Sequence, residues 1–262
     1  MNTENNKNIF FPAGTAEVNI IPVMQGDEQM KVEAGDLPDT LPILALRNAV
    51  LFPGMVYPVT IGREKSMTLI KDAEKRDLFI GAVPQVDVTV EEPSEKDLYE
   101  YGTVSRVMKV LEMPDGTITA IIQGVKRIRM AGVVSYEPYI TARVKYIDDI
   151  IPENDNSTKM IAESLKEKAA VIIKSSSFAP KEAIGALKSI DNYAFLVNFI
   201  ATTVEIENFM EKVQLLGIDD ITLRAMKLLQ VLDTQIQLLK IKQEINQKVK
   251  SDIDQQQREY YL

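Results

Sequence analysis

The sequence predicts an α+β protein with three parts: a coiled β-domain with one helix over residues 41–150, a helical bundle over 157–217, and one long helix over 218–262. Three observations support this division. Short runs rich in Val, Ile and Thr alternate with turns through the first part, which is typical of strands. After a turn-rich linker, the apolar residues take up a helical period with few breakers. After Gly217 the sequence contains no glycine or proline, so one helix can continue without a break.

Prolines interrupt the most apolar segment of the β-domain, which spans residues 41–66. They are Pro42, Pro53 and Pro58. Because proline has no N–H to donate to a β-ladder, it is confined to strand starts, edges and bulges. We therefore expect the first strand to begin where this segment begins and the chain to turn at Pro53–Gly54. Pro58 should lie at an edge or a bulge of the next strand.

The other strands are predicted by β-branched runs bounded by turn residues. One helix is expected among them over residues 63–76, where apolar residues recur at helical spacing. Asp115–Gly116, between two apolar runs, predicts a tight hairpin. Gly124 predicts a bulge or bend in the second of these runs, and Gly132 predicts its end. The expected strands cover residues 55–61, 78–84, 103–113, 117–132 and 139–148.

Helical periodicity begins after the linker IPENDNST. Ser157 or Thr158 can cap the first helix, and Asp191 can cap a later one. Asp219 or Asp220 can cap the long helix, which at 1.5 Å per residue would be about 65 Å long.

The apolar stripe of the long helix starts with a spacing of three and four residues and then drifts, so it is not a strict heptad repeat. It extends past what residues 157–217 could cover, and we therefore expect it to pack against a partner subunit or another domain. The simpler alternative is that it completes the helical bundle. The residues expected on the partner surface are Leu232, Ile236, Leu239, Ile245 and Val249.

The composition excludes several kinds of chemistry. The sequence contains no His, Cys or Trp, so it cannot supply a Ser-His-Asp or Cys-His nucleophile, the usual zinc sites or a disulfide. This is compatible with a reducing cytoplasm. No stretch has the length and apolarity of a signal peptide or a membrane span, so we expect a cytoplasmic protein without membrane contact. Residues 1–40 carry acidic side chains without a period and are expected to form a flexible leader.

The charge pattern argues against nucleic acid as a partner, because the net charge is -8. The most compact basic segment contains Lys126, Arg127 and Arg129, which we interpret as a solvated strand face. The acidic pairs at 148–149 and 219–220 have no titrating partner at a defined spacing. They are therefore expected to be turn and cap residues rather than a metal site or a pair of catalytic carboxylates.

Several motifs follow one another along the chain. In order they are LPILALR (41–47), FP (52–53), the proline at 58, GREKS (62–66), DLYEYGTVSRVMKVLEMPDGTITAIIQGVKRIRM (97–130) and QREYYL (257–262). Each alone is weak, but in this register they resemble the N-terminal region of Lon proteases over roughly residues 40–262. The resemblance implies a PUA-like β-barrel followed by a helical bundle and a long helix.

In Lon proteases an ATPase module of the AAA+ class and a protease domain with a Ser-Lys dyad follow this region. The sequence contains no GxxxxGK followed by Ser or Thr, so ATP and Mg²⁺ are expected only in an ATPase module beyond Leu262, and no catalysis is expected here. The resemblance implies recognition of unfolded or degron-bearing protein substrates and assembly towards a homohexamer. The alternative is a free-standing PUA-like protein-binding module with no protease attached.

Capture of unfolded proteins needs adaptable apolar side chains on exposed loops. The opening segment offers Phe52 on such a loop, although a large apolar residue more often plugs a core. A second pair of candidates lies at the tip of the predicted hairpin, and hairpin tips are usually solvated, so these residues should be exposed. The candidate substrate-contacting residues are Leu51, Phe52, Pro53 and Met55 in the loop, and Met113 and Pro114 at the hairpin tip.

Overall fold

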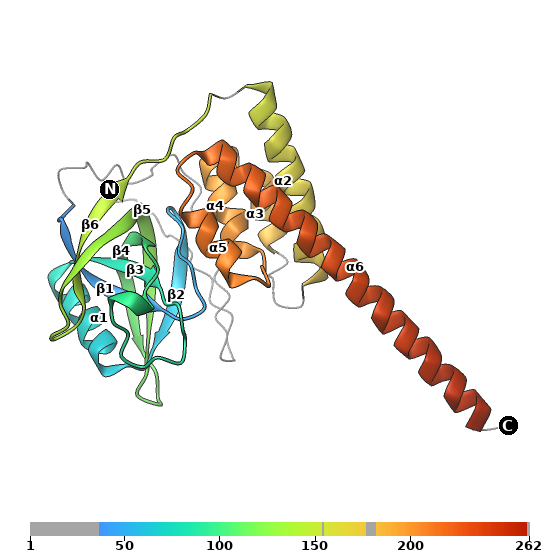
Figure 1. Ribbon diagram of the computed structural model, residues 1–262, viewed down its shortest axis with the longest axis horizontal. Helices are drawn as coiled ribbons and strands as arrows, with labels where there is room; N and C mark the ends of the chain where they lie inside the picture. Colours follow the sequence, from blue (N-terminus) through green and yellow to red (C-terminus); the bar gives the residue numbers. More distant parts are fainter. Residues whose placement is uncertain (1–36, 154, 177–181, 261–262) are drawn as a thin grey trace, which may run out of the picture. The chain divides into compact units, whose positions relative to one another are not determined.

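The computed structural model describes residues 37–153, 155–176 and 182–260. The chain divides into two compact units, Met1–Tyr146 and Ile147–Leu262. In the described residues the first unit holds the strands and the second holds five helices (Figure 1). This α+β architecture is the fold class that the sequence predicts.

The first unit is a strongly curved sheet that closes on itself. The strand order is β2-β5-β4-β3-β1-β6, and β5 also pairs with β6, so five strands form a ring that β2 extends at one side. The strands β1 and β3 run parallel, whereas the pairs β1–β6, β2–β5, β3–β4 and β4–β5 are antiparallel. The strands are β1 Thr40–Leu46, β2 Val56–Ile61, β3 Phe79–Pro84, β4 Tyr101–Glu112, β5 Ile118–Ser135 and β6 Thr141–Ile147.

The predicted turns and edges of this unit are confirmed, with one exception. Gly116 has φ 85 in the β4–β5 hairpin, and Gly54 has φ 80 in the Pro53–Gly54 turn. Pro58 lies on β2, which pairs only with β5 among the described strands and is therefore an edge strand. The prediction that Gly132 ends its strand is wrong, because β5 continues to Ser135.

A β-bulge in β5 brings the loop between β1 and β2 close to the barrel wall. Val104 pairs with Lys126 but the next residue of β4 pairs with Gly124, so β5 carries an extra residue at this point. The Gly54 amide donates to the Gly124 carbonyl at 2.9 Å, and the Gly124 amide donates to the Met55 carbonyl at 2.9 Å. A Cβ atom on residue 124 would lie 2.5 Å from the carbonyl oxygen of Phe52. Only glycine fits here without a shift of the backbone.

The helix α1, Glu64–Arg76, follows β2 and packs against the barrel through Leu69, Ile70 and Ala73. It lies where the sequence predicts a helix. The ordered β-unit starts earlier than the expected boundary at residue 41, since Leu37 is buried and β1 begins at Thr40. The expected leader otherwise lies outside the described residues.

The second unit is a helical bundle. Its helices are α2 Asn156–Ser175, α3 Glu182–Ser189, α4 Tyr193–Thr203, α5 Phe209–Leu216 and α6 Ile221–Tyr260. Asp155 caps α2 by accepting from the Thr158 amide, and Asn192 caps α4. The predicted caps Ser157, Thr158 and Asp191 are therefore each misplaced by one to three residues. Asp220 caps α6 as predicted, because its carboxylate accepts from the amides of Thr222 and Leu223.

A buried arginine connects the start of α6 to the linker that opens this unit. Arg224 is fully buried, and it donates to the Ile218 carbonyl from Nε at 3.0 Å and to Asn198 Oδ1 at 3.0 Å. Its Nη2 forms an ion pair with Asp149 Oδ1 at 2.8 Å. A buried guanidinium is tolerated only when it is paired and hydrogen-bonded in this way. The acidic pair at 148–149 was predicted to be turn or cap residues, but it lies in irregular backbone, and Asp149 instead pairs with a buried arginine.

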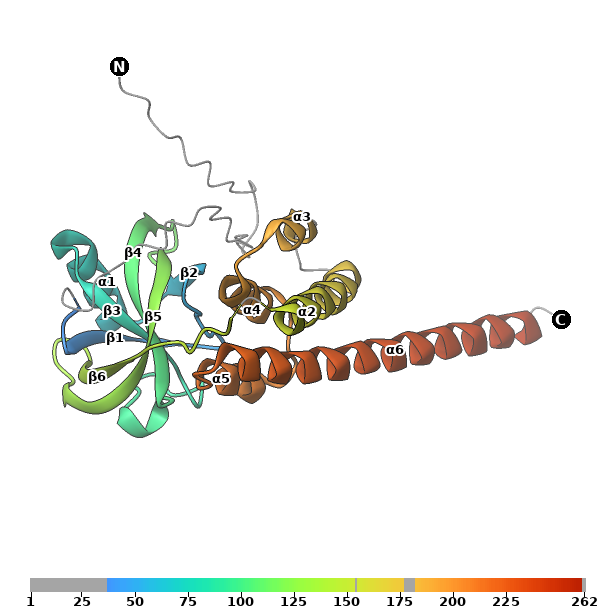
Figure 2. The ribbon, with the colours of Figure 1, turned by 90° about the horizontal axis from the view of Figure 1, so that it is seen from above.

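The helix α6 is packed along its first half and exposed along its second. Leu232 is buried, whereas Ile245 and Val249 are about half exposed. Both ribbon views show the C-terminal half of α6 (red) extending beyond the other helices of its unit (Figures 1 and 2). Leu232 therefore belongs to the bundle core, and the expectation that it lies on a partner surface is wrong. Among the described residues, no helix is long and apolar enough to cross a membrane.

The Gly124 contact leads to a first prediction. Gly124→Ala should lower the free energy of unfolding by about 2–3 kcal/mol, because the new Cβ overpacks against the Phe52 carbonyl. Gly62→Ala is the matched control, since its Cβ would meet only the Thr117 methyl at 3.9 Å. Urea denaturation followed by circular dichroism measures both. Equal stabilities of the two variants would show that the loop has room to move.

The side chain of Lys212 leads to a second prediction. Burial lowers the pKa of its ammonium to about 8, an effect only partly offset by Glu205. The folded state is therefore penalised for holding the charge at pH 7, and Lys212→Met should stabilise the protein there by about 2 kcal/mol. Because the unfolded lysine keeps its proton up to about pH 10, wild-type stability should rise above pH 8 and the advantage of the variant should shrink.

Denaturation at pH 7 and pH 9.5 measures this difference. The exposed Lys240→Met provides the control for losing a positive charge. A gain for Lys212→Met that stays constant with pH would contradict the explanation.

Candidate functional site

Two adjoining cavities of the β-unit form one groove beside β1, which we call the β1 groove. The first, of about 590 Å³, lies between β1, the first turn of α1, the loop before β4 and the turn before β6. The second, of about 500 Å³, lies between β1 and β2. Both are lined by Ala45, Arg63, Ser66 and Glu91, so they are continuous.

The lining of the first cavity is apolar at its centre. Ile43 and Ala45 come from β1, Leu69 from α1, and Tyr139 and Ile140 from the turn before β6. Ile43, Leu69 and Tyr139 are buried and form the floor, and Ala45 and Ile140 are partly exposed above them. The Tyr139 hydroxyl donates to Asp72 Oδ2 of α1 at 3.1 Å, which holds this turn against the helix. Burial, with that hydrogen bond, raises the pKa of Tyr139.

Charged side chains of both signs form the rim. Lys65 Nζ donates to Glu137 Oε1 at 2.6 Å and lies 3.8 Å from Glu92 Oε2, so it bridges two sides of the opening. The hydrogen bond from Lys65 to Glu137 raises the pKa of the lysine. These groups are exposed, and such ion pairs contribute little to stability. They can exchange partners with a ligand at small cost.

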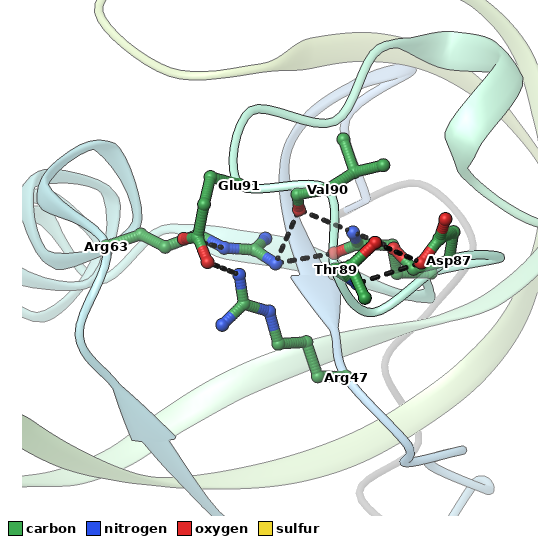
Figure 3. Close-up of polar contacts among 7 residues, drawn as sticks. Arg47, Arg63, Asp87, Thr89, Val90 and Glu91 are labelled. Atoms are coloured by element: carbon green, nitrogen blue, oxygen red, sulfur yellow. Dashed lines mark hydrogen bonds and ion pairs between the residues drawn. The ribbon is translucent and has the colours of Figure 1, made fainter.

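Two arginines meet at one carboxylate where the cavities join (Figure 3). Arg47 Nη2 lies 2.8 Å from Glu91 Oε1, and Arg63 Nε lies 3.9 Å from Glu91 Oε2. Arg63 also donates to Gln85 Oε1 at 2.6 Å and to the Val90 carbonyl at 3.3 Å. Burial and the charge of Arg47 lower the pKa of Arg63. The loop over residues 86–94 is thereby fixed as a wall of the groove.

This contact explains why the motifs LPILALR and GREKS contain arginines. Arg47 ends the first motif and Arg63 lies in the second, and the fold brings both to Glu91. The sequence analysis did not predict that these two arginines bind the same carboxylate, because spacing along the chain does not show that two residues share a partner. The run of two glutamates at 91–92 was the available signal.

The loop expected to contact substrates is mostly a core element. Leu51, Phe52 and Met55 are at most 1% exposed, so as surface contacts they were wrongly predicted. The cause is the Pro53–Gly54 turn and the close approach to Gly124, which press the loop onto the barrel. Phe52 faces the core, as the alternative interpretation held, and Pro53 alone of this group is partly exposed.

The hairpin tip behaves as expected for an exposed element. Met113 is 44% exposed, and Pro114 is exposed beside it. The prediction that the basic segment is a solvated strand face is wrong for Arg127, which is buried, whereas Arg129 is exposed and pairs with Glu100. A role of Met113 and Pro114 in binding stays a prediction. Among the described residues, no group of three or more acidic side chains is arranged to hold a metal ion.

Comparisons with known proteins place this geometry in a family. The model of the ATP-dependent protease La (LON) substrate-binding domain matches residues 40–234. The chain belongs to this family. It is 43% identical over 248 residues to a Lon protease of Flavobacterium johnsoniae and 41% identical over 249 residues to one of Cytophaga hutchinsonii. These alignments cover 94% and 95% of the chain but 30% of each relative, so the chain spans about 30% of their length.

Solved structures support the fold. The N-terminal domain of the Mycobacterium avium complex Lon protease matches with a TM-score of 0.58 at 18% identity, covering 74% of this chain and 98% of that one. The Lon N-terminal domain protein of Xanthomonas campestris matches with a TM-score of 0.54 at 18% identity, covering 72% and 96%. The resemblance to Lon N-terminal regions that the motifs predict is confirmed.

The arginine contact leads to a third prediction. Arg63→Met should release the loop over residues 86–94, because the buried Gln85 loses its charged partner. Backbone amides of this loop should exchange hydrogen about tenfold faster, which corresponds to the loss of one charge-assisted hydrogen bond. Lys75→Met, at an exposed position of α1, is the control. Unchanged exchange in Arg63→Met would show that other contacts fix the loop.

Proposed function

We propose that this chain is the substrate-recognition region of a Lon-type ATP-dependent protease, and that the β1 groove binds unfolded or degron-bearing protein segments. The observation that carries the proposal is an open groove with an apolar centre and a rim of both charges, in the unit that contains the start of the family match.

An apolar groove of this kind distinguishes unfolded from folded proteins. A folded protein buries most of its large apolar side chains, whereas an unfolded segment presents them in succession. The rim carries Lys65 and Arg63 beside Glu92 and Glu137, so it does not select one sign of charge. This combination suits a protein that accepts many different sequences.

The expected affinity is modest. Burying two or three apolar side chains contributes about 4–8 kcal/mol, and the loss of freedom on association cancels part of this. Only the surplus appears as binding free energy, so a single segment should bind weakly. A weak site is useful here, because a substrate has to be released onward for degradation.

The remaining functions of the parent enzyme belong elsewhere in it. Binding of ATP with Mg²⁺ and cleavage of peptide bonds need residues that this sequence does not offer, as it has no phosphate-binding GxxxxGK motif. The half-exposed Ile245 and Val249 of α6, with the partly buried Ile236 and Leu239, support a role in assembly towards a homohexamer. The absence of cysteine supports a cytoplasmic location.

The hairpin tip is a second candidate contact for the same function. Met113 combines exposure with a flexible, polarizable side chain that can adapt to different partners. It offers no cavity, however, so a segment bound there would bury less apolar surface than one in the groove.

The fourth prediction separates these two surfaces. Reduced, carboxymethylated α-lactalbumin, which stays unfolded, should bind the protein, and native α-lactalbumin should not. Tyr136→Ser should weaken binding about 5- to 10-fold, because Tyr136 lines the groove and loses an aromatic contact. Fluorescence anisotropy measures the dissociation constants, and thermal unfolding checks that each variant is folded.

Val134→Ser is the matched control, because Val134 is 58% exposed, lies two residues away and is not part of the groove lining. Met113→Ser tests the hairpin tip. Equal binding by Tyr136→Ser and wild type would contradict recognition in the groove, and a loss confined to Met113→Ser would move the site to the hairpin.

A further inference from the structure

One edge of β1 is paired with β6 along the first part of the strand only. The Ile43 amide donates to the Ile140 carbonyl at 2.8 Å, so odd-numbered residues of β1 turn their backbone groups towards β6. The Gln85 amide donates to the Leu46 carbonyl at 2.8 Å, so even-numbered residues turn theirs towards β3. Because backbone groups alternate along a strand, the N–H and C=O of Ala45 point to the same edge as those of Ile43.

The strand β6 does not reach Ala45. In the antiparallel register Pro42 lies opposite Thr141, where β6 begins. Continuing this register by three residues places Pro138 opposite Ala45. Proline has no N–H to donate, so the ladder cannot be extended there. Beyond the hydrogen bond of Ile43, none of the described strands pairs with this edge of β1.

The open edge lies inside the groove. Ala45 lines both cavities and is partly exposed. We propose that an extended polypeptide segment of an unfolded protein adds to β1 at Ala45 as a further strand, with alternate side chains on the apolar centre of the groove. This inference rests on the proposed function and specifies how the same site recognises its substrates.

A strand fits this site better than other occupants. An unpaired N–H and C=O on one edge require a partner with the same alternating pattern, which an extended backbone supplies. Side chains alternate at the same period of two, so every second residue can contact Ala45 and Ile140, the partly exposed apolar side chains of the lining. A small apolar ligand would leave the backbone groups of Ala45 without partners.

A second copy of this chain is a poor occupant. Besides the short open stretch of β1 at Ala45, the described sheet offers β2 as an edge strand, and β2 carries Pro58 at its centre. A proline there removes one of the N–H groups that a new ladder would need. An unfolded segment has no such restriction along most of its length.

Strand addition explains broad but limited specificity. The hydrogen bonds form with the peptide backbone, which all sequences share, and the apolar centre of the groove contacts every second side chain. Segments with alternating apolar residues should therefore bind, and segments with proline at a bonding position should not. Folded proteins are excluded because their strand edges are already paired or protected.

The test uses N-methylated peptides. The probe is a fluorescein-labelled peptide of about ten residues, capped at both ends, in which valine and lysine alternate. Two further versions carry N-methyl groups on all valines or on all lysines. In a bound strand only one of the two sets donates to β1, so one version should bind about tenfold more weakly and the other like the parent.

The protein is varied in parallel. Ala45→Pro removes the N–H at the open edge without removing a hydrogen bond to a described strand, and it should weaken the parent peptide about tenfold. Ala45→Ser keeps the N–H and should bind like wild type. Thermal unfolding checks the fold of both. If Ala45→Pro does not fold, the N-methylated pair tested on the wild-type protein decides the question alone.

Each outcome supports or contradicts a specific part of the proposal. Binding of both N-methylated peptides like the parent, or equal loss by both, would overturn strand addition. If unfolded α-lactalbumin still binds and Tyr136→Ser still weakens it, recognition in the groove stands without strand addition. If unfolded α-lactalbumin does not bind at all, the proposed function fails. A dimer in sedimentation that Ala45→Pro abolishes would assign the edge to a second copy and overturn the proposal.

Discussion

The close approach of the loop at residues 51–55 to Gly124 is the contact on which the architecture of the β-unit depends. The loop gives up regular pairing, and its backbone is satisfied instead by Gly124 on one side and by the Thr103 hydroxyl, which donates to the Leu51 carbonyl at 2.6 Å. The bulge beside Gly124 bends β5, so the same strand can pair with β2 at one end and β6 at the other. A side chain at 124 would force the loop out and uncover Phe52.

Proline positions then decide which edges of the sheet stay open. Pro58 limits what β2 can accept at the outer edge, and Pro138 prevents β6 from covering β1 at Ala45. The barrel is therefore closed through β5 and β6 but has a gap beside the second half of β1. The arginine contacts to Glu91 and to the Val90 carbonyl hold the neighbouring loop over residues 86–94 as a wall beside this gap.

The elements could be predicted from sequence because they depend on local patterns. The strands, the hairpin at Gly116 and the edge position of Pro58 follow from β-branched runs and breakers, and they lie within a few residues of their expected positions. The groove could not be predicted from the sequence, because it depends on contacts between segments that are distant along the chain. Nothing local shows that Arg47 and Arg63 share Glu91, or that Pro138 lies opposite Ala45. Phe52 illustrates the limit, since an apolar loop residue fits both a core and a surface.

The helix α6 shows the same limit in its apolar stripe. Periodicity groups Leu232 with Ile245, since it detects which residues share a face but not what covers that face. The bundle formed with α2, α4 and α5 covers the first half of the helix and leaves the second half exposed. Ile241, Ile245, Val249 and Ile253 remain about half exposed, each flanked by charged or amide side chains. Such a narrow apolar line is what a helix presents to a single partner surface rather than to a core, and this pattern supports the assembly role proposed above.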